Sequence, residues 1–202
     1  MIAIIDYGAA NIHSIEKALE RVGAKVRVTD DPQVVAEAHA VVLPGVGAGG
    51  SAMARMMERG LDDAIRSATQ QGKPFLGICL GMQLLAQHHD EGEVAGLGLF
   101  SGEVRRIPHG PKIPHMGWNQ VRALHDNLPI FADISSDAYF YFVHSYYVEP
   151  YDQHGVAAVT DYGSSFCSVI ATDQVWGTQF HPEKSGAVGQ QMLKNFVKWV
   201  KR

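Results

Sequence analysis

The residue pattern with the clearest chemical meaning is a cysteine between two glycines, Gly77-Ile78-Cys79-Leu80-Gly81. It follows the apolar run Pro74–Ile78 and precedes a helical pattern, so the cysteine is expected on a tight turn between a strand and a helix. Larger neighbours would clash in such a turn, whereas glycine fits. The amide end of the following helix favours a thiolate. We predict that Cys79 is a nucleophile and that the N–H of Leu80 faces a developing oxyanion.

A thiolate nucleophile needs a histidine within hydrogen-bond reach and a third group that orients this histidine. Among ten histidines, His181 differs because it follows the apolar pattern Val175–Phe180 and stands two residues before Glu183. Pro182 stiffens the backbone between them. Taken alone, these residues could simply form a polar turn before a helix. The presence of a nucleophile at Cys79 earlier in the chain favours a triad of Cys79, His181 and Glu183. The second cysteine, Cys167, lacks glycine neighbours and is assigned to the core.

Length and composition narrow the class of protein. The chain has 202 residues, of which 46% are hydrophobic and 19% charged, with a formal net charge of -4. These values fit one globular domain over residues 1–202 and argue against a nucleic-acid or membrane-surface partner. No apolar run reaches the roughly 20 residues of a membrane span, and no signal peptide is recognisable. Two cysteines without metal-type or framework spacing fit a cytoplasmic protein, and neither a metal nor a cofactor is expected.

The elements that must position the triad alternate along the first half of the chain. Strands are expected at residues 2–5, 25–28, 40–43 and 74–78, and helices at 12–22, 51–68 and 82–88. Strands that are apolar on both faces and separated by helices indicate a parallel sheet covered by helices. The second half is rich in strands and turns, with a hairpin at 165–171 and 175–180 and a last helix at 185–200. The prediction is one α/β domain with a mixed, mostly parallel sheet.

At this point a family resemblance becomes visible. Gly77–Gln83 (GICLGMQ) and Gln179–Lys184 (QFHPEK) resemble the two signatures of class I, triad-type glutamine amidotransferases, and Pro44–Gly47 resembles their oxyanion strand. The resemblance spans the chain and implies a flavodoxin-like fold with helices on both sides of a central sheet. It implies that Val46, Gly47 and Leu80 form the oxyanion hole. The residues that it implies for binding glutamine are Gly45, Gln83, Glu91, His144, Ser145 and Tyr146.

The same glycine-rich stretch, Gly45-Val46-Gly47-Ala48-Gly49-Gly50, also has the spacing of a dinucleotide-binding turn. It follows the third expected strand rather than the first, and no strand ending in an acidic residue lies about 20 residues later. Glycines can instead let a peptide turn its N–H toward an oxyanion. We therefore expect an oxyanion strand here and no nucleotide.

Three further stretches narrow the resemblance to the glutaminase subunits of imidazole glycerol phosphate synthases: Asp6–Asn11, Pro114–Asn119 (PHMGWN) and Tyr141–Tyr146 (YFVHSY). Such subunits hydrolyse L-glutamine through a cysteine thioester. Their ammonia passes to a (β/α)₈-barrel cyclase subunit within a heterodimer, which makes imidazole glycerol phosphate and the aminoimidazole carboxamide ribonucleotide for histidine synthesis. The positions that match this interface are Asn11, His115, Trp118, Tyr141 and Lys184.

Other interpretations stay open at this stage. Trp118 and Tyr141 could equally be core aromatics. The same chemistry could serve anthranilate or aminodeoxychorismate synthase, although the PHMGWN and FVHSYY stretches disfavour this, and the intact triad disfavours a degenerate scaffold. The chain departs from the family pattern at Ala9-Ala10, where relatives usually carry another glycine before the asparagine. Alanine tolerates positive φ poorly, so the loop before Asn11 is expected to be set differently.

Overall fold

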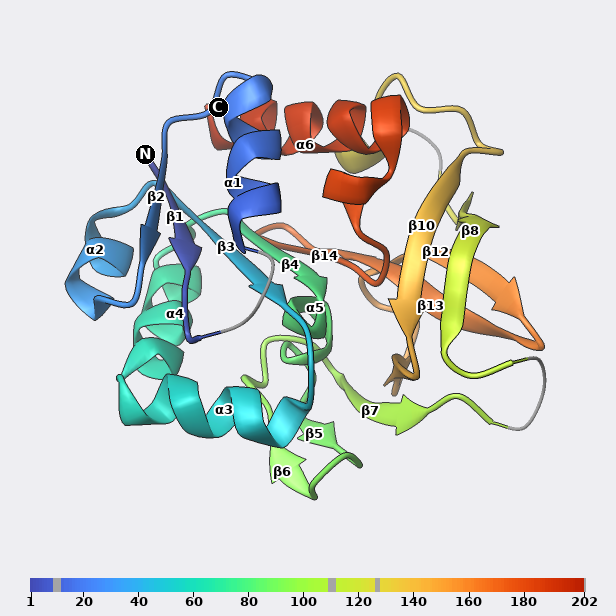
Figure 1. The fold of residues 1–202 in the computed structure, drawn as a ribbon, viewed down its shortest axis with the longest axis horizontal. Coiled ribbons are helices and arrows are strands. Elements are labelled where there is room, and N and C mark those ends of the chain that lie inside the picture. The colour runs from blue at the N-terminus through green and yellow to red at the C-terminus, as the bar shows by residue number, and fades with distance from the viewer. Residues whose placement is uncertain (9–11, 109–111, 126–127, 202) are drawn as a thin grey trace.

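The computed structural model describes residues 1–8, 12–108, 112–125 and 128–201 (Figure 1). Its first half alternates strands and helices, as predicted. In chain order the elements are β1 (Ile2–Ile5), α1 (Ile12–Arg21), β2 (Val26–Thr29), α2 (Pro32–Glu37), β3 (Ala40–Gly45), α3 (Gly49–Glu58), α4 (Leu61–Gln70), β4 (Phe75–Cys79) and α5 (Leu80–Gln83).

The second half consists mainly of strands and closes with one long helix. The elements are β5 (His88–His89), β6 (Val94–Ala95), β7 (Gly102–Arg106), β8 (His115–Gln120), β9 (Arg122–Ala123), the 3₁₀ turn η1 (Pro129–Phe131), β10 (Tyr139–His144), β11 (Tyr146–Pro150), β12 (Val156–Tyr162), β13 (Ser164–Ala171), β14 (Val175–Thr178), the 3₁₀ turn η2 (Pro182–Lys184) and α6 (Gly186–Val200).

In the described part of the chain, the main sheet has the strand order β2-β1-β3-β4-β14-β13-β11-β7-β5-β6. The strands from β2 to β14 are parallel. From there β13, β11 and β7 are each antiparallel to the strand before them, β5 is parallel to β7, and β6 is antiparallel to β5. Strand β12 pairs with β13 and β9. β8 and β10 form a separate antiparallel pair. The predicted mixed α/β sheet and the hairpin around Thr172-Asp173 are confirmed.

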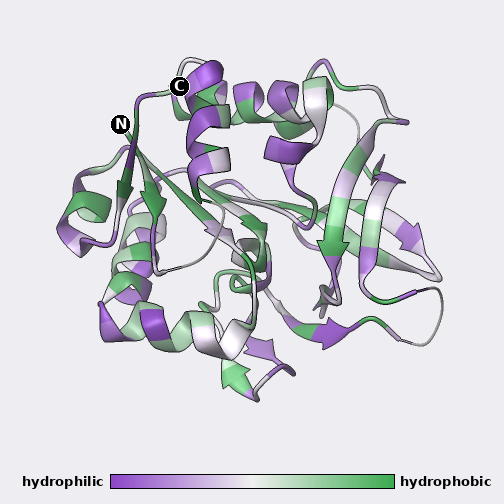
Figure 2. Cartoon of the chain, viewed as in Figure 1, coloured by the Kyte–Doolittle hydropathy of each residue, from purple (hydrophilic) through white to green (hydrophobic). Residues whose placement is uncertain are grey.

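Alternate residues of the parallel strands serve two different hydrophobic layers. Ile4, Val42 and Leu76 pack with the buried faces of α1 and α6. Ile5, Val41 and their neighbours pack on the opposite side with the apolar residues of α3 and α4. Because successive side chains of a strand point to opposite faces, both layers need apolar residues, and the strands appear continuously hydrophobic (Figure 2).

Several predicted boundaries were wrong. The helix expected at 51–68 is two helices, α3 and α4, separated at Gly60, whose φ of 66° breaks the helical backbone. The helix expected at 82–88 ends at Gln83, and His88 already belongs to β5. Pro44 continues β3 instead of ending it, beyond the last residue that pairs with β1. Helix α2 was not predicted, although Asp31 caps it by accepting from the Gln33 N–H at 2.9 Å.

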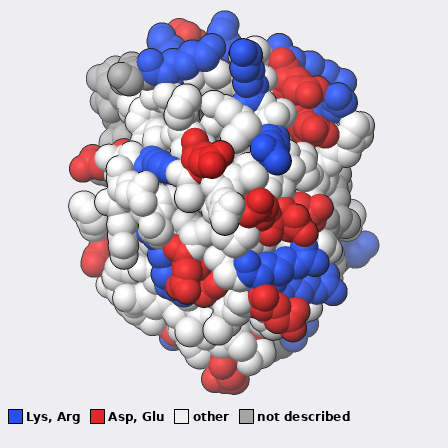
Figure 3. All heavy atoms as spheres, turned by 90° about the vertical axis from the view of Figure 1, so that its left-hand side faces the viewer, with Lys and Arg blue, Asp and Glu red and all other residues white. Residues whose placement is uncertain are grey.

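The surface carries charges of both signs. Acidic and basic side chains are interspersed over the face on the α2 side of the molecule (Figure 3). Among the described residues, none of the helices has the length and apolar character that crossing a membrane requires.

One consequence of the strand order determines the site. β4 and β14 are parallel neighbours at the middle of the sheet, although about a hundred residues separate them in sequence. Ile78 is paired with Thr178, so the segments that follow, at Cys79 and at His181, leave the sheet at the same edge. Such carboxyl ends of parallel strands are where α/β folds bind ligands.

Candidate active site

Cys79 stands at the turn between β4 and α5 with φ 54° and ψ -110°, a conformation that residues other than glycine rarely adopt. The two flanking glycines explain how the turn can exist. A side chain on Gly77 would come within 2.6 Å of the Gly81 carbonyl oxygen, and one on Gly81 would overlap the carbonyl oxygen of Leu43 on β3. Helix α5 has only four residues, so its contribution to a thiolate is smaller than the sequence suggested.

His181 and Glu183 are held together as the sequence predicted. Nδ1 of His181 lies 2.8 Å from Oε1 of Glu183, and the two side chains are only 2% and 3% exposed. Pro182 and Glu183 form the start of η2, which turns the carboxylate back toward the imidazole. The backbone N–H of His181 donates to the carbonyl of Tyr141 at 2.9 Å, which ties this loop to β10.

Charge on His181 follows from its two neighbours. Burial lowers the pKa of His181, but its interactions with Cys79 and Glu183 outweigh burial and raise the pKa from 6.5 to about 9. The imidazole is therefore protonated at neutral pH. Its second nitrogen, Nε2, is buried and meets the strict geometry of a hydrogen bond with no described group, so its interaction with Cys79 is a looser one. A proton on that nitrogen is available to a group entering beside Cys79.

Two contributors to this arrangement were not assigned a role from the sequence. Gln179 is fully buried; its Nε2 lies 3.8 Å from Sγ of Cys79, and its Oε1 accepts from Gln83 at 3.1 Å. Ser185 donates to the carbonyl of His181 at 2.7 Å and accepts from the N–H of Tyr141 at 3.0 Å. Both stand within or directly after the QFHPEK stretch, so their proximity to His181 was the signal that could have identified them.

A cavity of about 500 Å³ opens beside the cysteine. It is lined by most residues that the sequence assigned to the oxyanion and to glutamine: Val46, Gly47, Leu80, Gln83, Glu91, His144, Ser145 and Tyr146, together with Cys79, Ala48, Pro114 and Val143. Gly45 directly precedes Val46 and is paired with Cys79 across β3 and β4, and a side chain added at Gly45 would clash with the hydroxyl of Tyr7.

Glu91 brings a negative charge to the lining of the cavity. Its Oε2 accepts from the backbone N–H of Gly49 at 3.1 Å, which fixes the carboxylate although its loop is remote in sequence. Gln83 donates to the carbonyl of Tyr146 at 2.8 Å and to Gln179, so its own side-chain oxygen remains the acceptor. The cavity therefore combines a nucleophile with acceptors for a cationic group, whereas His181 is not among the residues that line it.

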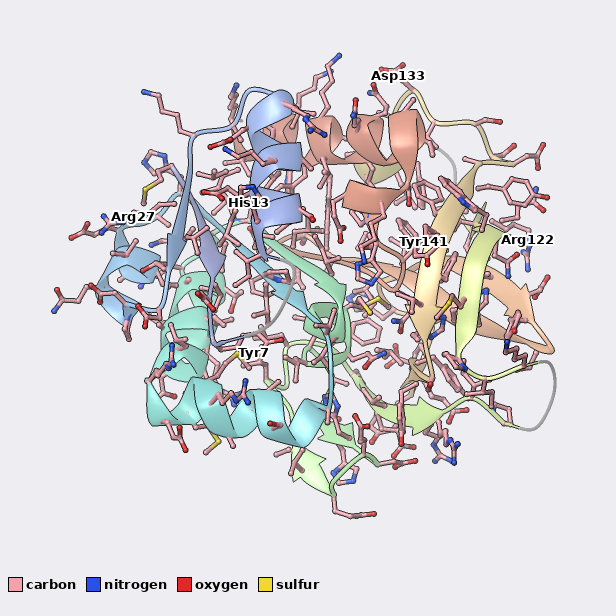
Figure 4. The ribbon with its side chains drawn as sticks, in the orientation of Figure 1. Tyr7, His13, Arg27, Arg122, Asp133 and Tyr141 are labelled. Carbon is pink, nitrogen blue, oxygen red and sulfur yellow. The ribbon has the colours of Figure 1, made fainter. Side chains whose placement is uncertain are left out.

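The residues expected at an interface do not all share one surface. Trp118 is 56% exposed and contacts Tyr141, its partner across β8 and β10, edge to face at 6.2 Å between ring centroids. Figure 4 labels Tyr141 on β10 and Tyr7 beyond the end of β1. Lys184 is exposed on η2. His115 belongs to the opposite, buried face of β8, which does not support a direct contact with a partner. Asn11 lies outside the described residues.

Among the described residues, no cluster of three or more histidine, cysteine, aspartate or glutamate side chains could hold a metal ion. Both cysteines are buried and unpaired with each other. Burial raises the pKa of Cys167 to about 12, in agreement with its assignment to the core.

Comparisons with known proteins agree with this geometry. The family model for glutamine amidotransferase class-I matches residues 3–199. A protein from Acinetobacter baylyi named imidazole glycerol phosphate synthase subunit HisH is 50% identical over 201 residues, 98% of each chain. Proteins of the same name from Moorella thermoacetica and Methanothermobacter thermautotrophicus are also 50% identical, covering 99% and 100% of this chain and 95% and 100% of their own length.

Solved structures share the fold at much lower identity. One titled glutamine amidotransferase superimposes with a TM-score of 0.79 at 17% identity, covering 100% of this chain and 99% of the other. PurLQS from Thermotoga maritima superimposes with a TM-score of 0.74 at 18% identity, with 99% and 96% covered. With its fold, its cysteine turn and its full-length relatives together, the chain belongs to the class I glutamine amidotransferases and, within them, to the HisH subunits of imidazole glycerol phosphate synthase.

Proposed function

We propose that this chain hydrolyses L-glutamine at Cys79 and supplies the ammonia to a cyclase subunit of imidazole glycerol phosphate synthase. The observation that carries the proposal is the strained Cys79 turn opening onto a 500 Å³ cavity, with the buried His181–Glu183 pair behind it. Full-length relatives at 50% identity named HisH support the assignment to this synthase.

In the first half of the reaction, Sγ of Cys79 attacks the side-chain amide carbon of glutamine. The amide oxygen becomes an oxyanion, which the N–H groups of Leu80 and of the Val46–Gly47 segment stabilise. Nε2 of His181 then protonates the amide nitrogen, the carbon–nitrogen bond breaks and ammonia leaves. Glu183 stabilises the imidazolium that starts this step, in agreement with the raised pKa of His181.

In the second half, the glutamyl thioester is hydrolysed. His181, now neutral, removes a proton from a water molecule, whose oxygen attacks the thioester carbon. The carbon–sulfur bond breaks, which restores the thiolate and leaves the imidazolium on His181. The product departs as glutamate once its new carboxyl group has lost the second proton of the water to solvent. The proton therefore returns to the nitrogen from which it came, and the chain needs no cofactor for the cycle.

Glutamine is positioned by the opposite part of the cavity. Glu91 suits the α-ammonium group by charge, and the free side-chain oxygen of Gln83 can accept from the same group. The corner from His144 to Tyr146 supplies backbone groups for the α-carboxylate. Glutamate differs from glutamine only at the reacting end, so these contacts bind both and do not by themselves distinguish substrate from product.

The partner is a (β/α)₈-barrel cyclase subunit that joins this chain in a heterodimer. The exposed face of β8 and β10, with Trp118 and Tyr141 and with Lys184 nearby, is the surface proposed for docking. Aromatic side chains of this kind are frequent anchors of interfaces. Two unpaired cysteines support a cytoplasmic location. The docked partner would receive the ammonia before it reaches water.

The test compares the two cysteines in the assembled complex. Cys79→Ala should remove glutamine-dependent ring formation by several orders of magnitude, because the nucleophile is lost. Synthesis from added ammonium salt should persist, since the cyclase subunit performs it. Cys167→Ala is the matched control and should retain both activities. Loss of ammonia-dependent synthesis in Cys79→Ala, or retention of glutamine-dependent synthesis, would overturn the proposal.

A further inference from the structure

A buried row of hydrogen bonds runs from β8 to the wall of the glutamine cavity. Its two histidines stand opposite each other in the antiparallel pair of β8 and β10, His115 against His144. Nδ1 of His115 lies 2.9 Å from Nε2 of His144, and Nδ1 of His144 lies 2.8 Å from the carbonyl oxygen of Tyr146. Both rings are buried, and His115 is only 3% exposed.

The partners at the two ends determine where every proton of this row lies. A carbonyl oxygen can only accept, so Nδ1 of His144 must carry a hydrogen. In a neutral ring its Nε2 then accepts, and Nδ1 of His115 must donate to it. The remaining nitrogen of His115, Nε2, therefore accepts, and the amide nitrogen of Asn119 lies 3.2 Å from it.

The orientation of the Asn119 amide is itself fixed. Its Oδ1 accepts from the N–H of Gln120 at 2.8 Å, and its Nδ2 also donates to the carbonyl of Asp161 at 3.0 Å. The amide nitrogen therefore faces His115. Burial lowers the pKa of His115 to about 4 and that of His144 to about 3, so both rings are neutral, as the one-way row of donors requires.

We propose that Asn119 and His115 are positioning residues for glutamine binding. Through them His144 is held as the neutral tautomer with hydrogen on Nδ1, and this N–H holds the Tyr146 carbonyl in the cavity wall. The same carbonyl accepts from Gln83, which reaches Gln179 and through it the sulfur of Cys79. The inference rests on the proposed glutaminase function, because it assigns these residues to its substrate cavity.

His115 contributes both stacking and hydrogen bonding, and substitutions can separate the two contributions. Its ring stacks on Phe142 and Tyr162 at centroid distances of 4.8 and 3.9 Å. Phenylalanine would preserve this stacking but would leave Nε2 of His144 without its donor. Asparagine would lose the stacking but could place a side-chain N–H near the position of Nδ1. The two substitutions therefore separate packing from hydrogen bonding.

The first experiment reads the tautomers directly in the full-length wild-type chain at neutral pH. Nitrogen-15 spectra of histidine-labelled protein distinguish a protonated ring nitrogen from a bare one. The expected result is a protonated Nδ1 and a bare Nε2 in both His115 and His144. A proton on Nε2 of His144, or an imidazolium in either ring, would overturn the proposal whatever the activity of the chain.

The second experiment measures glutaminase kinetics of the assembled synthase. His115→Phe should raise KM for glutamine roughly tenfold with kcat changed by less than about twofold, as expected when one partner of a buried hydrogen bond is lost. His115→Asn should recover most of the loss, and His154→Phe, the same change at an exposed turn, should have no effect. An unchanged KM in folded His115→Phe, or an equal fall in kcat, would contradict the positioning role.

The two experiments keep the inference separate from the function on which it rests. A wild-type complex without glutaminase activity would refute the proposed function and remove the cavity's role, even if both tautomers were found as expected. An active wild-type complex with the wrong tautomers would refute only the positioning role. If His115→Phe does not fold, the tautomers of the wild-type chain still test the positioning role.

Discussion

The substitution Glu183→Gln tests the triad most sharply, because it removes one charge and little else. The glutamine amide oxygen can still accept from Nδ1 of His181, so the orientation of the ring is retained. What is lost is a charge-assisted hydrogen bond of 2.8 Å between side chains only 2% and 3% exposed, where water screens little. Hydrogen bonds to charged groups are worth about 1.5–3 kcal/mol, so kcat/KM should fall roughly 10- to 150-fold.

The pH profile provides a second and independent measure of the same change. Glu183 is one of the groups that raise the pKa of His181 to about 9, so its neutralisation should lower that pKa. The alkaline limb of glutamine hydrolysis should therefore begin near pH 9 in the wild type and move to lower pH in the variant. Glutamate release by the assembled synthase, followed from pH 6 to 10, measures both effects.

Glu16→Gln is the control, since His13 and Glu16 form a similar pair at 3.3 Å on the surface, where His13 is 78% exposed. It should change neither the rate nor the profile. A loss in Glu183→Gln as large as that in Cys79→Ala would show that the carboxylate does more than stabilise His181. An unmoved alkaline limb would show that His181 does not set it.

Two further predictions concern the fold around the site. In urea unfolding, Gly81→Ala should destabilise the chain by about 3 kcal/mol or more, because the added methyl group would overlap the Leu43 carbonyl oxygen. Gly50→Ala is the control and should be nearly neutral, because the nearest contact of its methyl group is an ordinary 3.5 Å. Equal unfolding midpoints of the two variants would refute the close approach at Gly81. Burial also lowers the pKa of His89, His115 and His144 to about 4, 4 and 3, below the ordinary 6.5. Their stability contribution is present above pH 6.5 and lost as pH falls toward these values, with about 2–3 kcal/mol for each lost by pH 4.5. His181 adds nothing to this loss of stability in acid, because its pKa is raised in the folded chain and it is protonated below pH 6.5 in both the folded and the unfolded state. Urea unfolding at pH 7 and pH 4.5 measures the loss. Equal free energies of unfolding at the two pH values would contradict the prediction.

The parallel half of the fold was predictable because its signals are local. Residues 2–5 and 74–78 are continuously apolar, and the stripe of α1 repeats at helical spacing, so neither depends on distant contacts. The end of α5 was not predictable from such periodicity. Met82 to His88 carries apolar residues that suit a helix. The carbonyl oxygens of Leu84 and Leu85 instead accept backbone hydrogen bonds from the 97–100 segment. This contact depends on tertiary packing, which the local periodicity does not show.

The triad was predictable for a similar reason, because its signals lie within two residues of the residues concerned. Glycine stands two positions before and after Cys79, and proline stands between His181 and Glu183. The hydrogen-bond row was not. His115 and Trp118 belong to one short strand, and the PHMGWN stretch alone does not tell which of them faces inward. The register of β8 against β10 decides this, and a shift by one residue would exchange the two faces.

The late position of β14 in the chain has a consequence for synthesis. This strand lies between β4 and β13, so until its residues leave the ribosome β4 has an unpaired edge in the middle of the future sheet. Cys79 is made early, but the partner histidine follows about a hundred residues later, directly after β14. A nascent or truncated chain that lacks His181 therefore carries a thiol without its acid, and it is not expected to hydrolyse glutamine.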